Sequence, residues 1–259
     1  VIAAVQKWEK ALDKSDPKYE HNRLEALWVH QWHDMLNVEL LRKVLESPEP
    51  RARAQAVRVL GYWRDRVPGA LALLQKAAGD DNMRVRLEAV RVASFFTGAD
   101  SLEALEIAYK VLQKPTDYYI DYCFMETLKQ LQSLQRGFVL PADSKVQDIV
   151  LEKLSDADLN TAPNVEAVLQ VRLSRKSISS GVKESALAEL AKLHQSSREV
   201  ELVEALRRFD AAGGKSASAT EELGKLIAVT PAAKLLAAKD RFHGLAESAA
   251  TTGVKRAAW

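Results

Sequence analysis

The chain lacks most of the patterns on which familiar functional sites depend. It has one cysteine, Cys123, so it can form no internal disulfide, and it has no Cys-x-x-Cys-His or paired Cys/His spacing for haem or zinc. No apolar run approaches the ~18 residues of a membrane-spanning helix. Lys and Arg number 37 against 35 Asp and Glu, and the net charge of +2 is too balanced to predict nucleic acid or an anionic membrane as partner. We therefore expect no cofactor and no membrane insertion.

Glycine and proline are also scarce, with 11 and 8 residues, which is typical of long helices joined by short turns. A six-residue sequence motif, called here the phrase, recurs along the chain. It consists of a long or small residue, Arg or Lys, two variable positions, Ala, and an apolar residue. It occupies residues 22–27, 52–57, 85–90, 182–187 and 254–259. The first three copies begin 30 and then 33 positions apart, a period typical of stacked helical hairpins. The sequence therefore predicts an all-α superhelix.

Each repeat is predicted to be a first helix, a turn, and a second helix that begins with the phrase. The helices expected in the regular part cover 2–13, 20–35, 38–46, 51–63, 68–78, 83–96, 101–113 and 118–134. After Gln135 we expect a loop at 136–141, irregular chain at 156–163, a linker at 213–218, and helices at 143–154, 164–175, 181–194, 198–211, 219–228, 231–247 and from 254. Gly-Gly-Lys-Ser in that linker has neither the strand nor the upstream glycine of a phosphate loop.

As a domain assignment, the chain is interpreted as one α-solenoid over 1–259, with regular repeats at 1–135 and more divergent ones at 142–259. Val1 is not a start methionine, and Trp259 ends the last copy of the phrase. We therefore expect the chain to be a segment of a longer protein. The residues alone do not indicate the cellular compartment of the protein.

The composition of the phrase has a physical explanation. Its alanine lets neighbouring helices approach closely, and Cys123 falls at the same position in the fourth repeat, where packing accounts for it. Its Arg or Lys lies in the first helical turn, where the macrodipole disfavours a cation. We expect acidic residues of the preceding turn to offset it, and we expect Pro68 in the first turn of its helix. The expected pairs are Glu20 with Arg23, Glu49 with Arg53, and Asp80 and Asp81 with Arg86.

Residues 80–89, Asp-Asp-Asn-Met-Arg-Val-Arg-Leu-Glu-Ala, are similar to the HEAT-repeat signature, in which a turn aspartate is followed by Val-Arg and Ala. Three further strings carry a closer resemblance: 23–31, 59–68 and 117–122. Together they resemble the HEAT-like region of large PVC-type bacterial proteins. Those proteins combine a membrane-bound-dehydrogenase-like β-propeller, a HEAT/armadillo-like α-solenoid, and a haem-binding cytochrome c module. The present chain resembles the solenoid part.

That resemblance implies an exported or periplasmic multidomain redox protein in which this segment is a noncatalytic scaffold. The partner would be another domain of the same longer chain or a separate protein. No haem or dehydrogenase residue can be carried over, because the Cys-x-x-Cys-His motif and the propeller strands are absent from this sequence. The segment itself is therefore not expected to be an enzyme, although the intact protein would be one.

Superposing the repeats predicts a candidate partner-binding face on the second helices. Positions three and four apart share a helix face, and in HEAT-like arrays the second helices commonly line the concave side. Trp, Tyr and Arg are the residue types that dominate interface hot spots. Aromatic residues at these positions could instead pack between repeats. Tyr118 and Tyr119 likewise have two possible roles, binding a partner or packing in the core. The candidate face, called here the strip, consists of Trp28, Trp32, Arg58, Tyr62, Arg91, Phe95 and Tyr122.

Two alternative functions remain open from the residues. The first is nucleic-acid binding by an arginine-rich concave face, for which phosphate contacts would make binding salt-dependent. The second is an enzyme with a site in the concave groove. His30 and His33 lie three apart beside Asp34 and could contribute to a metal site, but a third convergent ligand is needed. The arginines in question are Arg51, Arg53, Arg58, Arg64, Arg66, Arg84, Arg86 and Arg91.

Overall fold

The structure is a computed structural model that describes the backbone of residues 1–259 and the side chains outside residues 214–215. Within this described part the regular elements are all helices, and no β-strand occurs. The all-α prediction is confirmed. The helices separate into two compact units, Val1–Gln147 and Asp148–Trp259. No helix among the described residues has the length and apolar character needed to cross a membrane.

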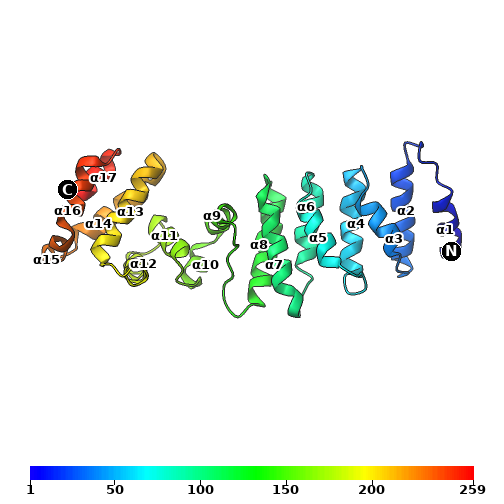
Figure 1. Cartoon of the computed structure of the whole chain (residues 1–259), viewed down its shortest axis with the longest axis horizontal. Helices are drawn as coiled ribbons and strands as arrows, with labels where there is room; N and C mark the ends of the chain where they lie inside the picture. The colour runs from blue at the N-terminus through cyan, green and yellow to red at the C-terminus, as the bar shows by residue number, and fades with distance from the viewer. The chain divides into compact units, whose positions relative to one another are not determined.

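The first unit consists of helical hairpins in which each second helix packs on the next (Figure 1). The second helices are α2 (Tyr19–Trp32), α4 (Pro50–Trp63), α6 (Met83–Ala93) and α8 (Tyr118–Ser133). The first helices are α1 (Ile2–Lys10), α3 (Val38–Leu45), α5 (Ala70–Ala78) and α7 (Ser101–Lys110), with short 3₁₀ turns η1 (Gly98–Asp100) and η2 (Val111–Gln113) around α7. Because α4 contacts α2 and α6, and α6 contacts α8, the second helices form one continuous layer.

Side-chain caps define where three of the four second helices, α4, α6 and α8, begin. Glu49 accepts a hydrogen bond from the backbone N–H of Arg51, with Pro50 at the first helical position of α4. Asn82 caps α6 and Asp117 caps α8 in the same way. The prediction that Pro68 lies in the first turn of its helix is wrong, because α5 begins at Ala70. The residue between them, Gly69, has φ 73°, a left-handed conformation that a helical first turn cannot include.

Two cations of the phrase, Arg53 and Arg86, bridge neighbouring hairpins. Arg23 does pair with Glu20, at 3.0 Å, but Arg53 donates to Asp80 of the next hairpin. Arg86 binds main-chain carbonyls, those of Asp80 and Asp81 at 3.0 and 3.1 Å and that of Pro115 in the following turn. Arg53 with Glu49, and Arg86 with the two aspartates, form no direct ion pair among the described side chains, but the charges of Glu49 and Asp81 still interact favourably with Arg53 and Arg86 as expected. Both side chains lie along the seam where two hairpins stack, and there the carbonyls and Asp80 are the nearest acceptors.

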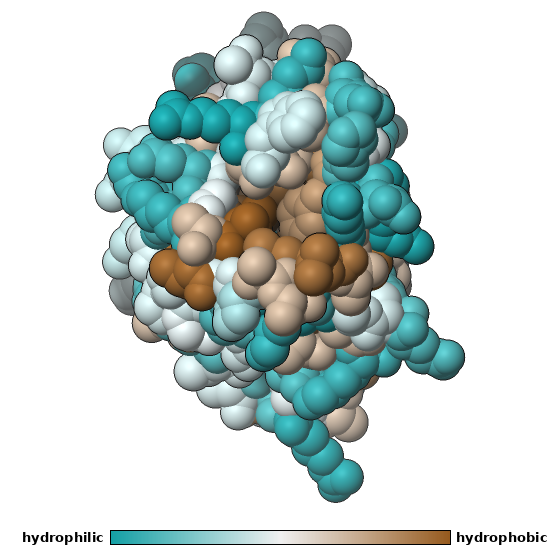
Figure 2. Space-filling model, turned by 90° about the vertical axis from the view of Figure 1, so that its left-hand side faces the viewer, coloured by the Kyte–Doolittle hydropathy of each residue, from teal (hydrophilic) through white to brown (hydrophobic). Residues whose placement is uncertain are grey.

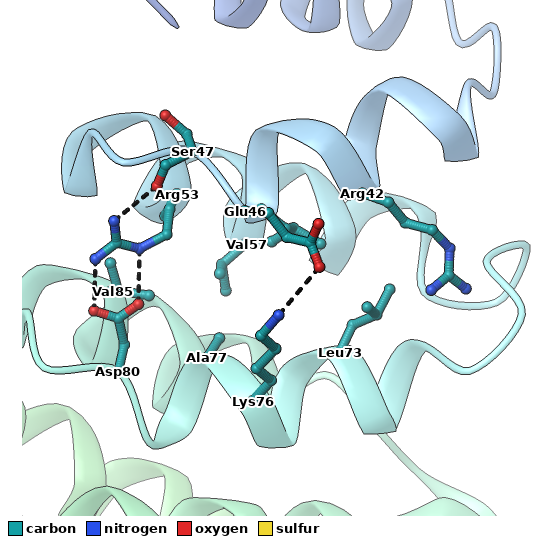
Figure 3. A pocket seen from close by; sticks show the side chains of 11 residues that line it. Arg42, Glu46, Ser47, Arg53, Val57, Leu73, Lys76, Ala77, Asp80 and Val85 are labelled. Carbon is teal, nitrogen blue, oxygen red and sulfur yellow. Dashed lines mark hydrogen bonds and ion pairs between the residues drawn. The ribbon is translucent and has the colours of Figure 1, made fainter.

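Figure 3 shows this seam from close by, where α3 and α4 face α5 across a pocket of about 480 Å³. At one side Arg53 bonds Asp80 and the carbonyl of Ser47. Nearer the middle, Lys76 of α5 reaches Glu46 at 3.1 Å. These polar contacts surround an apolar floor that includes Val57. The pocket is therefore part of the packing between hairpins.

The second unit is built from shorter helices around its own core. Its elements, together with α9 at the boundary, are α9 (Ser144–Lys153), α10 (Asp156–Thr161), α11 (Glu166–Ser174), α12 (Ser180–Leu193), α13 (Arg198–Ala212), η3 (Gly213–Ser216), α14 (Ala217–Ala228), α15 (Ala232–Leu235), η4 (Leu236–Ala238), α16 (Lys239–Ser248) and α17 (Thr252–Ala258). Leu187, Leu206 and Leu223 are fully buried and join α12, α13 and α14 in one core. The core of this unit therefore comes from several successive helices.

Two predictions for this half are wrong. Residues 156–163 were expected to be irregular, but Ser155 accepts a hydrogen bond from the N–H of Asp158 and begins helix α10. The expected linker at 213–218 is instead η3 followed directly by the start of α14. The Lys215 side chain, which a phosphate loop would use, lies outside the described residues.

One end of the second unit presents apolar side chains to solvent. Figure 2 shows hydrophobic residues gathered on this surface, with hydrophilic residues around them. Val229, which follows α14, and Leu236 of η4 are 77% and 66% exposed. The described part of the unit therefore leaves some large apolar side chains without a packing partner.

Candidate interaction surface

The strip predicted from the repeats lies on the four second helices of the first unit, except for Phe95, which lies in the turn after α6. Its aromatic residues differ in burial: Trp32, Tyr62 and Tyr122 are 88%, 60% and 62% exposed, whereas Trp28 and Phe95 are half-buried. Trp32, Tyr62 and Tyr122 therefore do not pack between repeats. By contrast Trp63, the neighbour of Tyr62, is 1% exposed and belongs to the core.

A buried carboxylate holds the two arginines of the strip together. Glu88 of α6 has a side chain only 8% exposed. Arg58 of α4 donates to both of its oxygens, with Nη2–Oε1 and Nε–Oε2 distances of 2.5 and 3.3 Å. Arg91, one turn further along α6, donates from Nε at 3.0 Å. Hydrogen bonding to Glu88 raises the pKa of Arg58, against the opposing effect of burial. Two cations thus share one anion, and the group keeps a net positive charge.

Aromatic rings lie beside this charged group. The guanidinium of Arg91 lies over the ring of Phe95, 5.4 Å from its centroid, and that of Arg64 lies 5.8 Å from it. Such cation–π contacts restrain the arginine side chains without using up their N–H donors. The structure therefore brings Arg58, Arg91 and Phe95 into one cluster. Trp28 and Trp32 lie on α2, outside this cluster.

Arg91 and Tyr122 line a shared pocket of about 540 Å³ between α6 and α8. Two hydrogen bonds join these helices: Thr127 Oγ1 donates to the carbonyl of Val90 at 3.1 Å, and the Gln130 amide donates to that of Ser94 at 2.8 Å. The pocket wall also includes Cys123, and burial raises the pKa of its thiol. A raised pKa disfavours the reactive thiolate, which agrees with a packing role for this cysteine.

Two neighbours of Tyr122 extend the exposed aromatic surface. Tyr118 and Tyr119 are 75% and 68% exposed. The Tyr118 ring is stacked on that of Tyr122 at 6.4 Å and meets that of Tyr119 edge-on at 5.6 Å. The sequence left their role open between packing and binding. In the structure their rings face solvent at the start of α8.

Two of the three donors considered for a metal, His30 and Asp34, are engaged elsewhere, and His33 is exposed. His30 is buried, with Nδ1 3.1 Å from the carbonyl oxygen of Met35 and Nε2 3.2 Å from the amide nitrogen of Asn37. The tautomer that fits carries its proton on Nδ1 and accepts at Nε2. Asp34 forms an ion pair with Arg66 instead. No group of three or more His, Cys, Asp or Glu side chains suited to a metal ion occurs in the described part of the chain.

Most of the arginines that suggested nucleic-acid binding have partners within the protein. Arg53, Arg58, Arg64, Arg66 and Arg91 pair with carboxylates. Arg86 is 2% exposed and binds carbonyls. Only Arg51 and Arg84 are exposed without an ion pair among the described residues. The charge available to phosphates is therefore smaller than the sequence suggests.

The fold and this surface together define an all-helical repeat protein whose second helices present aromatic and arginine side chains to solvent. Residues 38–119 match the family model described as HEAT repeats, so the resemblance seen in the sequence is confirmed for this segment. Such repeats are typically protein-interaction scaffolds. Comparison with the curated proteins and with the solved structures gave no match. The matched model does not concern a dehydrogenase or cytochrome module, so that context stays a prediction.

Proposed function

We propose that this chain is a noncatalytic scaffold that binds a partner protein through the strip. The observation that carries the proposal is the exposure of Trp32, Tyr62 and Tyr122, on three of the four second helices, beside a well-packed core. Exposing rings of this size to water costs free energy, roughly 25 cal/mol for each Å² of apolar area. A partner that covers them recovers that free energy. Binding hot spots in protein interfaces are enriched in aromatic and arginine side chains.

The partner we propose is either another module of a longer chain or a separate protein. Both are consistent with the resemblance to PVC-type proteins, which would place the scaffold in an exported or periplasmic redox assembly. In that setting the scaffold would position the redox modules and would itself carry out no chemistry. Glu88, the buried carboxylate nearest the pocket of the strip, is neutralised by two arginines and is poorly suited to act as a base.

Site-specific photo-crosslinking in the organism that encodes the chain tests this proposal. A photoreactive phenylalanine analogue replaces Tyr62 in one variant and Tyr122 in another. Matched controls carry it at Gln75 of α5 and Glu103 of α7, which are exposed positions on first helices. The proposal predicts that both strip positions capture the same protein segment and that the controls do not. Equal capture from strip and control positions would contradict it.

A further inference from the structure

The face of α4 and α6 carries an excess of positive charge in a regular pattern. Arg51 and Arg58 are seven residues apart on α4, and Arg84 and Arg91 are seven apart on α6. Seven residues are close to two helical turns, so each pair lies on one side of its helix, about 10 Å apart along the axis. Because α4 packs on α6, the four arginines form two rows across adjacent helices.

The one carboxylate within the two helices does not neutralise the four arginines of these rows. Glu88 is the only acidic residue in the two helices, and it is buried between Arg58 and Arg91. Arg58 donates to Glu88 from Nε and Nη2, and Arg91 donates from Nε with its Nη2 2.9 Å from Oε2, so Nη1 of each guanidinium is free of that carboxylate. Arg51 and Arg84 have no ion pair among the described side chains. Two arginine rows therefore offer donors to a ligand.

The acidic residues at the starts of the second helices are engaged in other contacts. Glu49 accepts from the N–H of Arg51, and Asp117 accepts from that of Ile120. Asp81 binds Lys114 at 2.6 Å. These three residues lie at helix N-termini, where the macrodipole offsets negative charge. Because they line the same pocket as Arg51 and Arg84, they offset part of the positive charge of that row.

Apolar side chains accompany both rows. Arg51, Arg84, Leu87 and Tyr119 line one pocket of about 1190 Å³ at the starts of the second helices, and the carboxylates named above, Glu49, Asp81 and Asp117, line it as well. The other row lies near Tyr122, which shares a pocket with Arg91. A ligand for this face therefore needs anionic groups and apolar groups in alternation. A polypeptide with acidic and apolar side chains has that chemistry, whereas a uniform phosphate backbone has no apolar groups to place beside Leu87 and the tyrosines.

We propose that this face binds an acidic segment of the partner protein, with carboxylates on the two arginine rows and apolar side chains between them. The proposal rests on the scaffold function and specifies the partner's chemistry. Rows about 10 Å apart match carboxylates about three residues apart in a polyproline II chain, which has three residues per turn and advances about 3.1 Å per residue, so that every third side chain lies on one face. Arginine binds carboxylates through paired, charge-assisted hydrogen bonds, so carboxylates are favoured over amides of the same shape.

A selection from random displayed peptides of about 12 residues, carried out on the full chain, tests this chemistry. The expected result is enrichment of Asp and Glu about three positions apart among the peptides that bind. A synthetic copy with Gln in place of these acids should bind about tenfold more weakly, and the acidic peptide should lose affinity between about 50 mM and about 500 mM NaCl.

Variants of the chain locate the binding. R51Q/R84Q removes two arginines that have no ion pair, and it should weaken the acidic peptide about fivefold or more. R58Q/E88Q/R91Q removes the other row without leaving Glu88 buried and unpaired, and it should weaken the peptide about tenfold. The control K43Q/K76Q removes two exposed charges from the first helices α3 and α5, and it should change affinity less than about twofold. Circular dichroism confirms that each variant is folded.

Three results would overturn the proposal. One is selection of peptides without acidic enrichment whose binding still depends on Tyr62 and Tyr122; the scaffold function would then stand and the acidic partner would not. Another is equal loss of affinity in K43Q/K76Q. The last is binding of a duplex oligonucleotide of about 20 base pairs with the same dependence on the arginine rows, while no acidic peptide binds.

Discussion

Arg53 of one hairpin and Asp80 of the next are joined by two parallel hydrogen bonds, Nε to Oδ2 at 2.8 Å and Nη2 to Oδ1 at 2.9 Å. Their side chains are 20% and 14% exposed, so water competes weakly for either partner. This pair fixes the stacking of α4 on the following hairpin. It thereby sets the spacing of the second helices on which the strip lies.

Asp80→Asn removes the charge of this pair and leaves Arg53 partly buried without a counterion. We expect a loss of about 2 kcal/mol in the free energy of unfolding of the first unit. Chemical denaturation followed by tryptophan fluorescence measures it, since Trp8, Trp28, Trp32 and Trp63 all lie in that unit. Asp65→Asn is the control, because Asp65 is 79% exposed and 3.6 Å from Arg64, and it should change stability by less than about 0.5 kcal/mol. Equal losses would contradict this role of Asp80.

Gly61→Ala should disturb the closest approach of α4 to α6. A Cβ at Gly61 would lie 2.7 Å from Cγ2 of Val92, and the χ1 of a valine in a helix is too stiff to move away cheaply. We expect a loss of about 1–3 kcal/mol despite the better helix propensity of alanine. Val92→Ala in the same chain should restore most of it. Gly244→Ala in α16, where a Cβ meets no atom within 4 Å, should instead be neutral or stabilising. Equal effects at both glycines would exclude the steric explanation.

His194 should make the second unit pH-dependent. Its Nδ1 lies 3.0 Å from Oε1 of Glu201, and its Nε2 lies 3.5 Å from Glu166. The hydrogen bond to Glu201 raises the pKa of His194 above its usual 6.5. Since the folded pKa is the higher one, this stabilisation is complete below pH 6.5 and is lost as the pH rises through the raised value.

The measurement is the protection of α13 against hydrogen exchange, compared between the chain and His194→Gln across this pH range. Protection should fall with rising pH in the unaltered chain, and the fall should be smaller in the variant. An NMR titration of the His194 ring with and without Glu201→Gln gives the pKa directly. The same ring pKa in both proteins would contradict the assigned cause.

Trp32 and Trp63 should respond to alanine in opposite ways. Trp63 is 1% exposed, and Trp63→Ala should cost about 3–5 kcal/mol of stability. Trp32 is 88% exposed, and Trp32→Ala should leave stability within about 0.5 kcal/mol. The same denaturation experiment measures both changes. A large loss of stability in Trp32→Ala would mean that this ring packs in the fold and is unavailable to a partner.

The repeat phrase predicted the starts of α4 and α6 to within one residue, because Pro50 and Asn82 are local helix-start signals. Local rules did not predict the partner of Arg53, since Asp80 lies 27 residues away and reaches it only when two hairpins stack. The strip was placed on the second helices from periodicity alone. Which of its rings are exposed could not be predicted, because Trp28 and Trp32 share one helix face and differ only in their neighbours. The position of Arg91 three residues after Glu88 was a signal in the sequence for their ion pair.

The most direct test of the strip as a binding surface is the affinity of the chain for the partner captured by crosslinking. Isothermal titration compares W32S/Y62S/Y122S with L102S/V229S/L236S, a matched control in which three exposed apolar residues outside the strip are changed. Loss of three hot-spot rings should weaken binding about 100-fold or more, while the control should stay within about twofold. Equal affinities of the two variants for the partner would contradict the assignment of binding to this surface.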